Sequence, residues 1–377
     1  MRRVIVAPDK FKGSLTAIQV AAHLEVGLRT GQPDLEIAQL PLADGGEGTV
    51  DAAVSAGFHR VSARVSGPTG QLVDACLAVR GDTAVVELAE ASGLSRLPGG
   101  RPAPLTASSR GTGELLRVAL DAGCRQVVLA IGGSACTDGG AGMLQALGMR
   151  LLDRAERELA PGAVPLLDLD HVDLSGLDPR LSQTAVTLAS DVDNPLLGPS
   201  GAATIYGPQK GAGPADIPRL EAALTRWASI LCREIGPHDP ADQPGAGAAG
   251  GVGFAALAIL AAHRRPGVDV LLELVGFDAA VREADLVVTG EGSLDDQSLY
   301  GKAPVGVAAA ARVHGVSTVA VAGRCSLTAA QLFAAGFDRA YPLTDIEPDL
   351  GRCMSQAGSL VEQVGGRIAA DRQRGKA

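Results

Sequence analysis

Five polar clusters, each flanked by glycines, hold the side chains of this sequence that could do chemistry. They are APDKFKGSLT (7–16), PLADGGEGT (41–49), IGGSACTDGGAGM (131–143), ASDVDNPLLG with GPQKGAG (189–198 and 207–213), and TGEGSLDDQSLYGKAPVGVA (289–308). In each, carboxylate, ammonium or hydroxyl groups stand beside glycine, whose missing side chain lets a ligand approach the backbone. Such clusters are typical of sites for phosphate and for Mg²⁺.

The first and fifth clusters combine lysines with helix starts. Lys10 and Lys12 precede a predicted helix whose N-cap is Ser14 or Thr16, and Lys302 precedes another predicted helix. Free N–H groups and the helix dipole attract anions at such positions. We interpret both clusters as phosphate sites. A surface turn with solvated lysines is the alternative for the first, and a long polar loop for the fifth.

Carboxylates dominate the second and fourth clusters. Asp44 and Glu47 lie within one turn of each other between glycines, and Asp191 directly follows a predicted strand. Carboxylates so placed hold Mg²⁺ through water or accept a proton from a hydroxyl. The alternatives are an Asx turn in which Asp44 caps the next helix, and a type I turn at Asn194 and the proline after it.

The central cluster and the GPQKGAG loop leave two interpretations open. Ser134 and Thr137 offer hydroxyls and Asp138 a carboxylate, but a plain strand–helix connection would also use these residues. Lys210 stands between glycines, either in a phosphate-contacting loop or as an exposed lysine.

The common signatures of other enzyme classes are missing. The sequence has no GxxxxGK[ST] and no HRD, DFG or HExxH, and its one GxGxxG, GAGAAG at 245–250, follows a proline-rich loop and not a predicted strand. The P-loop, protein-kinase, zincin and dinucleotide interpretations are therefore not supported. The six histidines stand alone outside the clusters, and the six cysteines form no CxxC pair. Neither a zinc site nor a disulfide framework is indicated, and scattered cysteines fit a reducing cytoplasm.

Composition indicates a globular chain. Of 377 residues, 46% are hydrophobic and 20% charged, and the formal net charge of −9 argues against nucleic acid as a partner. The apolar run near the N-terminus is too short for a secretory signal. The long uncharged stretch at 245–262 begins with glycine and alanine, so we interpret it as a glycine loop that enters a buried helix, not as a membrane span.

These clusters need elements to position them, and the pattern predicts an α/β fold. Short apolar runs at 4–7, 35–42, 126–131, 185–190, 284–290 and 317–323 read as strands and alternate with helical patterns, whereas 60–88 reads as three short strands. We predict a discontinuous, three-layer Rossmann-like domain from 1–60 and 281–377, and an inserted α/β domain with a mixed sheet from 61–280.

Taken in order, these clusters, together with SSRGTGELL (108–116) and GAGAAGGVG (245–253), resemble the type-1 glycerate kinase family. The resemblance implies ATP-dependent phosphorylation of D-glycerate with Mg²⁺, most often to 2-phosphoglycerate, by two α/β domains with the active site in the cleft between them. Cys136, Thr137 and Ser293 depart from the family pattern. Where Ser293 replaces an arginine, any phosphate contact from that position is lost or supplied by another residue.

The resemblance also suggests roles. Asp44 or Asp191 would orient or deprotonate the attacking hydroxyl, and Lys12 and Lys302 would stabilise the transferring phosphate. Glu47, Asp191 and Glu291 are the expected Mg²⁺ ligands, and Lys12, Arg110 or Arg324 would bind the carboxylate of glycerate. The expected substrate and nucleotide contacts are Asp9, Lys10, Ser14, Gly45, Gly46, Glu47, Arg110, Gly132, Gly133, Ser134, Asp138, Asn194, Lys210, Gly290 and Glu291.

Other assignments stay open on the same scaffold. One is a kinase for a related small hydroxy or sugar acid, and the other is a catalytically inactive ligand-binding protein. In either case we expect a small-molecule partner, no nucleic acid or membrane, a cytoplasmic location, and a monomer or homodimer.

Overall fold

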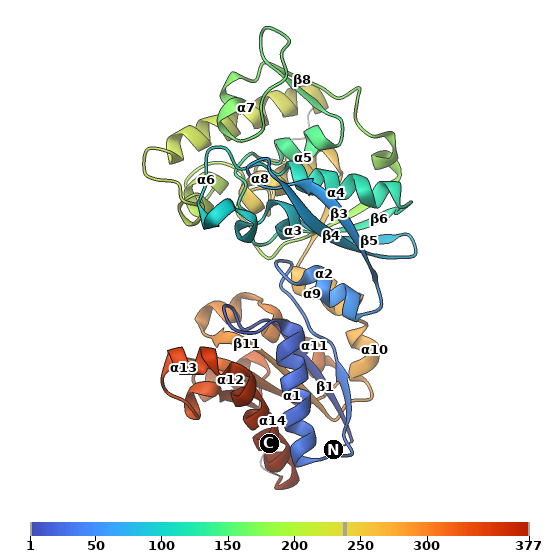
Figure 1. Cartoon of the computed structure of the whole chain (residues 1–377), viewed down its shortest axis with the longest axis vertical. Helices are drawn as coiled ribbons and strands as arrows, with labels where there is room; N and C mark the ends of the chain where they lie inside the picture. Colours follow the sequence, from blue (N-terminus) through green and yellow to red (C-terminus); the bar gives the residue numbers. More distant parts are fainter. Residues whose placement is uncertain (1, 237–239, 376–377) are drawn as a thin grey trace. The chain divides into compact units, whose positions relative to one another are not determined.

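Two compact units make up the chain, each with its own sheet and hydrophobic core (Figure 1). The computed structural model describes residues 2–236 and 240–375. Unit 1 comprises Met1–Asp44, Asp51–Gly57 and Gly267–Ala377, and unit 2 comprises Gly45–Val50 and Phe58–Pro266. The continuous part of unit 2 therefore spans residues 58–266, whereas the sequence predicts an inserted domain of residues 61–280.

The second boundary lies earlier than predicted because helices α9 (Gly267–Leu274) and α10 (Phe277–Val281) belong to unit 1. Val268, Leu271 and Phe277 pack into the same core as Ile5 of the first strand. The sequence pattern shows that these helices are amphipathic, but not which sheet receives their apolar faces.

Unit 1 contains a five-stranded parallel sheet in the order β13-β12-β11-β1-β2. Its strands are β1 (Arg3–Pro8), β2 (Glu36–Gln39), β11 (Leu286–Leu294), β12 (Thr318–Cys325) and β13 (Arg339–Pro342). Read along the chain, this is the 2-1-3-4-5 order of flavodoxin-like doubly wound folds, not the classical Rossmann order. The strand order reverses between β1 and β11, so ligands are expected at the carboxyl ends of these two strands.

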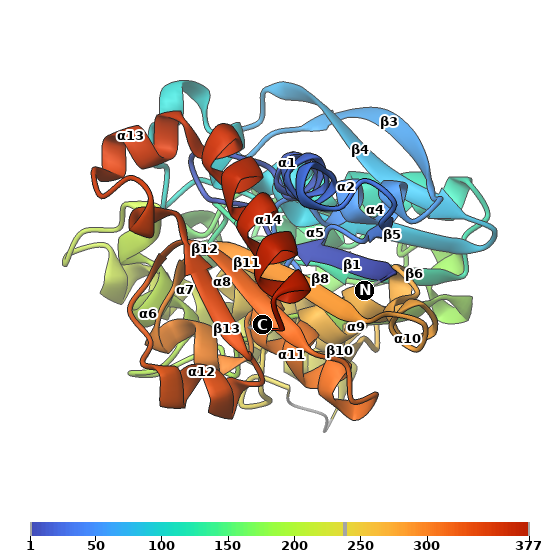
Figure 2. The same cartoon turned by 90° about the horizontal axis from the view of Figure 1, so that it is seen from below.

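Helices cover both faces of this sheet and form the predicted three layers. Val4 and Val6 pack with α1 (Ala17–Gly31) and α14 (Ala357–Gln373), whereas the alternate residues Ile5 and Ala7 pack with α9 and α11 (Ala303–Val313). Helices α1 and α14 lie side by side (Figures 1 and 2), and a Cβ atom on Gly27 would lie only 2.0 Å from a backbone oxygen of α14. The remaining helices are α12 (Ala329–Ala335), α13 (Leu350–Ser355) and α2 (Thr49–Ser55), whose first two residues belong to unit 2.

Unit 2 contains the predicted mixed sheet, in the order β10-β9-β6-β5-β4-β3. Strands β3 to β5 pair antiparallel, and β5, β6, β9 and β10 pair parallel. The strands are β3 (His59–Ser66), β4 (Leu72–Arg80), β5 (Thr83–Glu87), β6 (Gln126–Ala130), β9 (Ala185–Ala189) and β10 (His263–Arg265), with a separate pair β7 (Arg150–Leu152) and β8 (His171–Asp173).

Six α-helices of unit 2 are α3 (Leu88–Ser92), α4 (Arg110–Asp121), α5 (Ala141–Ala146), α6 (Ala202–Tyr206), α7 (Ile217–Ile235) and α8 (Ala248–Ile259). Trp227 of α7 meets Phe254 of α8 edge to face, with ring centroids 6.3 Å apart, inside the core. Short 3₁₀ turns in the two units span Leu94–Arg96, Pro98–Gly100, Val164–Asp168, Pro179–Gln183, Pro208–Lys210, Asp296–Tyr300 and Leu343–Asp345.

The uncharged stretch at 245–262 is a glycine loop that leads into the buried helix α8, as predicted. Gly250 and Gly251 have φ angles of +69° and +92°, which only glycine adopts without strain. Within residues 2–236 and 240–375, no helix is both long and apolar enough to cross a membrane.

Candidate functional site

Three carboxyl groups converge at the point of unit 1 where the strand order reverses. Asp9 follows β1, and its backbone N–H donates to the oxygen of Gly290 in β11 at 2.8 Å. Burial, the negative charge of Asp44 and, more weakly, that of Glu291 raise the pKa of Asp9 to about 7, while a hydrogen bond and the charge of Lys10 oppose the shift. Asp9 therefore exchanges its proton near neutral pH.

Glu291 lies beside Asp9's strand with one carboxylate oxygen engaged and one not. Lys302, the N-cap residue of α11, donates from Nζ to Oε2 at 3.4 Å. The other oxygen, Oε1, is buried and has no hydrogen bond of ordinary geometry within the described part of the chain. Burial raises the pKa of Glu291, and the nearby Ser298 hydroxyl and the Lys302 ammonium oppose this. A buried, unpaired carboxylate oxygen fits a cation or a ligand donor.

The first cluster (7–16) packs against the fifth (289–308), a contact between segments that are far apart in the sequence. The backbone nitrogen of Lys12 would lie 3.2 Å from a Cβ atom on Gly292, and the Lys12 side chain is exposed. Ser14 donates its hydroxyl to the oxygen of Phe11 at 3.0 Å, so it stabilises the turn. Of the two predicted N-caps of α1, Thr16 is correct, in a capping box.

Arg324 provides a guanidinium group beside the departure at Ser293. It extends from β12, and its Nε donates to the Ser293 hydroxyl at 3.0 Å. Ser293 in turn donates to Asp295 at 3.1 Å. A cation is therefore present next to the position where the family pattern has an arginine.

In unit 2, Asp138 serves as an anchor inside the protein. It is 0% exposed, and its Oδ2 accepts from the Ser108 hydroxyl at 3.0 Å, from the backbone and hydroxyl of Ser109 at 2.8 and 3.0 Å, and from the Gly142 backbone at 3.2 Å. Burial raises its pKa, which the hydrogen bonds from Ser109 and then Ser108 oppose. Asp138 is therefore buried beneath the 131–143 loop, where it links the first residues of α4 and α5. A residue that contacts a ligand is expected to reach the surface, and Asp138 does not.

Lys210 is also inside the protein, so the interpretation of it as an exposed lysine is wrong. Its side chain is 2% exposed, and Nζ donates to the Ser134 hydroxyl at 2.8 Å and to the Cys136 oxygen at 2.6 Å. Burial lowers its pKa. Lys210 therefore fixes the shape of the central cluster, and Gly133 is the residue of the 132–134 loop that remains exposed.

The second and third clusters meet backbone to backbone. Gly132 donates to the oxygen of Gly45 at 2.9 Å, and a Cβ atom on Gly132 would lie 2.6 Å from the Cα of Gly46. The side chain of Glu47 lies close to Gly133, with its Cγ 3.4 Å from the position of a Cβ there.

Glu87 is a further residue of this site that the sequence motifs do not indicate. It is 3% exposed at the end of β5, and its carboxylate accepts from the backbone of Gly48 at 3.3 Å and of Val50 at 3.0 Å. It thereby holds the segment that follows Asp44. Its position at the carboxyl end of a predicted strand, the criterion applied to Asp191, could have identified it.

The fourth cluster has two exposed acids, Asp191 and Asp193, and one structural amide. The side chain of Asn194 donates to the Ser200 oxygen at 2.8 Å and accepts from the Tyr206 hydroxyl at 2.5 Å, so it holds its own turn.

On α4, Arg110 is partly exposed and pairs with Glu114 at 3.2 Å.

The predicted magnesium ligands belong to two units, Glu291 to unit 1 and Glu47 and Asp191 to unit 2. Among the described residues, no group of three or more His, Cys, Asp or Glu side chains could hold a metal ion. Mg²⁺ commonly takes one or two protein carboxylates and completes its shell with water and phosphate. The unpaired Oε1 of Glu291 fits such a ligand.

The chain is similar to glycerate kinases in sequence and in fold. The model of the glycerate kinase family matches residues 4–373. A glycerate kinase of Halalkalibacterium halodurans is 45% identical over 98% of both chains, and a glycerate 2-kinase of Escherichia coli is 44% identical over 85% of both. A crystal structure assigned to glycerate kinase 2 from Salmonella typhimurium LT2 superposes with a TM-score of 0.85 at 41% identity and covers 100% of this chain and 99% of that one.

Proposed function

We propose that this chain, which belongs to the glycerate kinase family, transfers the γ-phosphoryl group of ATP to D-glycerate and forms 2-phosphoglycerate. It is an enzyme of that family, a phosphotransferase with an alcohol group as acceptor. The observation that carries the proposal is the group of Asp9, Asp44, Glu291 and Lys302 where the strand order of unit 1 reverses. This group combines a proton acceptor, an unpaired anionic oxygen and a cation.

The hydroxyl of glycerate must lose a proton as its oxygen attacks the γ-phosphorus. The new phosphorus–oxygen bond forms while the bond between the γ-phosphorus and the bridging oxygen of ADP breaks. In our proposal Asp9, with the carboxylate of Asp44 nearby, takes this proton. A pKa near 7 for Asp9 suits the exchange at neutral pH. Asp191 remains the alternative base.

Positive charge is needed where the phosphoryl group transfers. We assign this to Lys302, to the exposed Lys12 and to Arg324, which stands beside Ser293. Mg²⁺, when bound with ATP, would neutralise phosphate charge, and Glu291 would be a ligand through Oε1. Glu47 and Asp191 are the alternative ligands, each acting through water. Backbone N–H groups of loops 132–134 and 207–211 would contact phosphate or glycerate oxygens.

The cysteines bear on the proposed location. All six are free thiols in the structure. Free thiols in a chain of this size fit the reducing cytoplasm that we propose.

Product analysis tests the proposed reaction. Incubation with D-glycerate and Mg-ATP, followed by ³¹P and ¹H NMR, should show ADP and 2-phosphoglycerate. Exclusive formation of 3-phosphoglycerate would refute the regiochemistry. Turnover of other hydroxy acids without turnover of glycerate would favour a related sugar-acid kinase, and nucleotide binding without any turnover would favour an inactive binding protein.

Two neighbouring aspartates allow a matched test of the alternative base. Asp191→Asn should lower kcat by about a hundredfold if Asp191 takes the proton. Asp193→Asn, two residues away in an exposed pair with Arg264, should leave kcat nearly unchanged. Equal kcat in both variants would leave Asp9 and Asp44 as the proton acceptors.

A further inference from the structure

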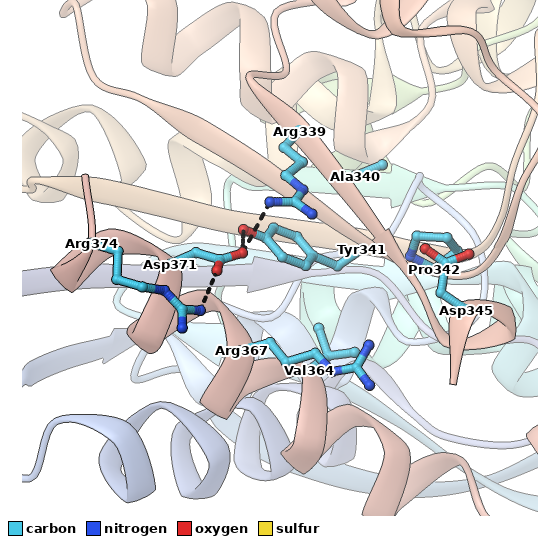
Figure 3. Close-up of a pocket in the computed structure, with 9 residues that line it drawn as sticks. All are labelled: Arg339, Ala340, Tyr341, Pro342, Asp345, Val364, Arg367, Asp371 and Arg374. Carbon is cyan, nitrogen blue, oxygen red and sulfur yellow. Dashed lines mark hydrogen bonds and ion pairs between the residues drawn. The ribbon is translucent and has the colours of Figure 1, made fainter. Parts of the chain in front are cut away.

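A second group of cationic side chains lies in unit 1, outside the glycine clusters. It surrounds a cavity of about 290 Å³ formed by β13, the turn that follows it and the C-terminal half of α14 (Figure 3). Because all these elements belong to unit 1, the cavity is defined within that unit. The polar groups in its wall are Arg339, Tyr341, Asp345, Arg367, Asp371 and Arg374.

The donors of this wall already hold one carboxylate, that of Asp371. Its Oδ2 accepts from Arg339 at 3.0 Å and from the Tyr341 hydroxyl at 3.2 Å, and its Oδ1 accepts from Arg374 at 2.8 Å. The hydrogen bond from Arg374 is the main reason that the pKa of Asp371 is lowered. A guanidinium group has five N–H donors, so both arginines keep donors for a further acceptor.

Arg367 is the cation that the internal carboxylate does not satisfy. It lies four residues before Asp371 on α14, the spacing at which an arginine and an aspartate normally pair. Figure 3 shows its guanidinium turned away from Asp371, and no ion pair joins Arg367 to a carboxylate of residues 2–236 or 240–375. Three arginines against two aspartates give the wall a formal charge of +1, whereas the whole chain carries −9.

We propose that this cavity binds a small polyol phosphate, with Arg367 as the principal contact and Arg339 and Arg374 completing the site. The planar guanidinium fork matches the oxygens of a phosphate group. A volume of about 290 Å³ accommodates a ligand of a few carbon atoms and not a nucleotide. Asp345 in the same wall would repel a purely anionic ligand and accept a hydrogen bond from a hydroxyl group next to the phosphate. The carbonyl end of α14 also repels anions, so binding requires more than one arginine.

Calorimetric titration with glycerol 3-phosphate and with inorganic phosphate, at low ionic strength, tests this proposal. The wild-type chain is compared with Arg367→Gln, which removes the unsatisfied cation, and with Arg352→Gln, which removes an exposed arginine of α13 outside the cavity. Both substitutions are on the surface, so both variants should fold. Any binding of phosphate elsewhere is common to all three chains.

The expected result is at least tenfold weaker binding of glycerol 3-phosphate to Arg367→Gln and unchanged binding to Arg352→Gln. Inorganic phosphate should bind the wild type more weakly than the ester, because it lacks the hydroxyl that would face Asp345. Equal affinity of Arg367→Gln and wild type for the ester would overturn the proposal. An equal loss in both variants would also overturn it, since that would indicate a general effect of net charge.

Discussion

The buried carboxyl group of Asp9 makes the stability of the protein depend on pH. In the unfolded chain its pKa is near the ordinary 3.8, and in the folded chain burial and the charge of Asp44 raise it to about 7. Between these values the folded state binds more protons than the unfolded state, so the free energy of unfolding falls as pH rises through this window. A difference of one in pKa corresponds to about 1.4 kcal/mol.

Asp9→Asn removes this ionisation and keeps an oxygen that can accept from the Lys10 backbone. Urea denaturation at pH 5 and pH 8 should show that the variant gains stability relative to the wild type as pH rises. Asp34→Asn, at an exposed turn of the same unit, should show no such gain. A constant difference between wild type and Asp9→Asn across this range would contradict the raised pKa.

Lys210 illustrates a lysine that holds a site together from inside. Lys210→Ala should lower the free energy of unfolding by about 2–4 kcal/mol, because it leaves a cavity and removes the donor to Ser134 and Cys136. Gln209→Ala, at the exposed neighbouring position, should change it by less than about 0.5 kcal/mol. Urea titrations of both variants compare the two values. Similar stabilities would mean that the central cluster keeps its shape without Lys210.

At the scale of elements, backbone contacts between loops define the candidate site in unit 2. A Cβ atom on Gly132 would collide with the Gly46 backbone at 2.6 Å, and rotation of a side chain cannot relieve this. Gly132→Ala should therefore destabilise the protein by about 2 kcal/mol or more and lower kcat/KM. Gly213→Ala, whose Cβ would meet its nearest atom at 3.6 Å, is the matched control and should unfold at the wild-type urea concentration. If Gly132→Ala behaves like this control, the two clusters do not need their close approach.

Local patterns predicted most elements of the fold, whereas non-local contacts decided the rest. Buried strands such as β1 and β6 follow from short apolar runs between turn residues, and Thr16 is one of the two N-caps of α1 that the sequence offers. The burial of Lys210 depends on a carbonyl 74 residues away, and the function of Glu87 on N–H groups 37 and 39 residues away. Local periodicity does not contain these contacts. The burial of Lys210 therefore cannot be predicted from it, and the strand-end position of Glu87 indicates a candidate residue but not the N–H groups that it binds.

At the scale of the whole molecule, the chain enters unit 2 twice, first for a six-residue excursion and then for the continuous part of that unit. Gly45–Val50 belongs to unit 2, although Asp44 before it and Asp51 after it belong to unit 1. The peptide bond between Asp44 and Gly45 therefore joins the carboxyl cluster of one unit to the glycine loops of the other. The excursion is held by Glu87 and by Gly132, through the hydrogen bonds described above. Unit 2 thus depends on a short segment that lies outside its continuous part, Phe58–Pro266.

Fragments of unit 2 test this dependence. Fragment 58–266 contains every strand of the six-stranded sheet and should fold, but with Glu87 deprived of its partners in Gly45–Val50. Fragment 45–266 restores those partners and should be more stable by about 1–3 kcal/mol in urea denaturation.

Fragment 58–280 ends at the boundary predicted from the sequence, and it should aggregate more readily than 58–266 because Val268, Leu271 and Phe277 lose the core of unit 1. Equal stability of 45–266 and 58–266 would show that the excursion contributes nothing to unit 2. Glu87 would then act only on the segment that it holds, and its replacement by Gln should change kcat/KM in the full chain while leaving the free energy of unfolding of fragment 58–266 unaltered.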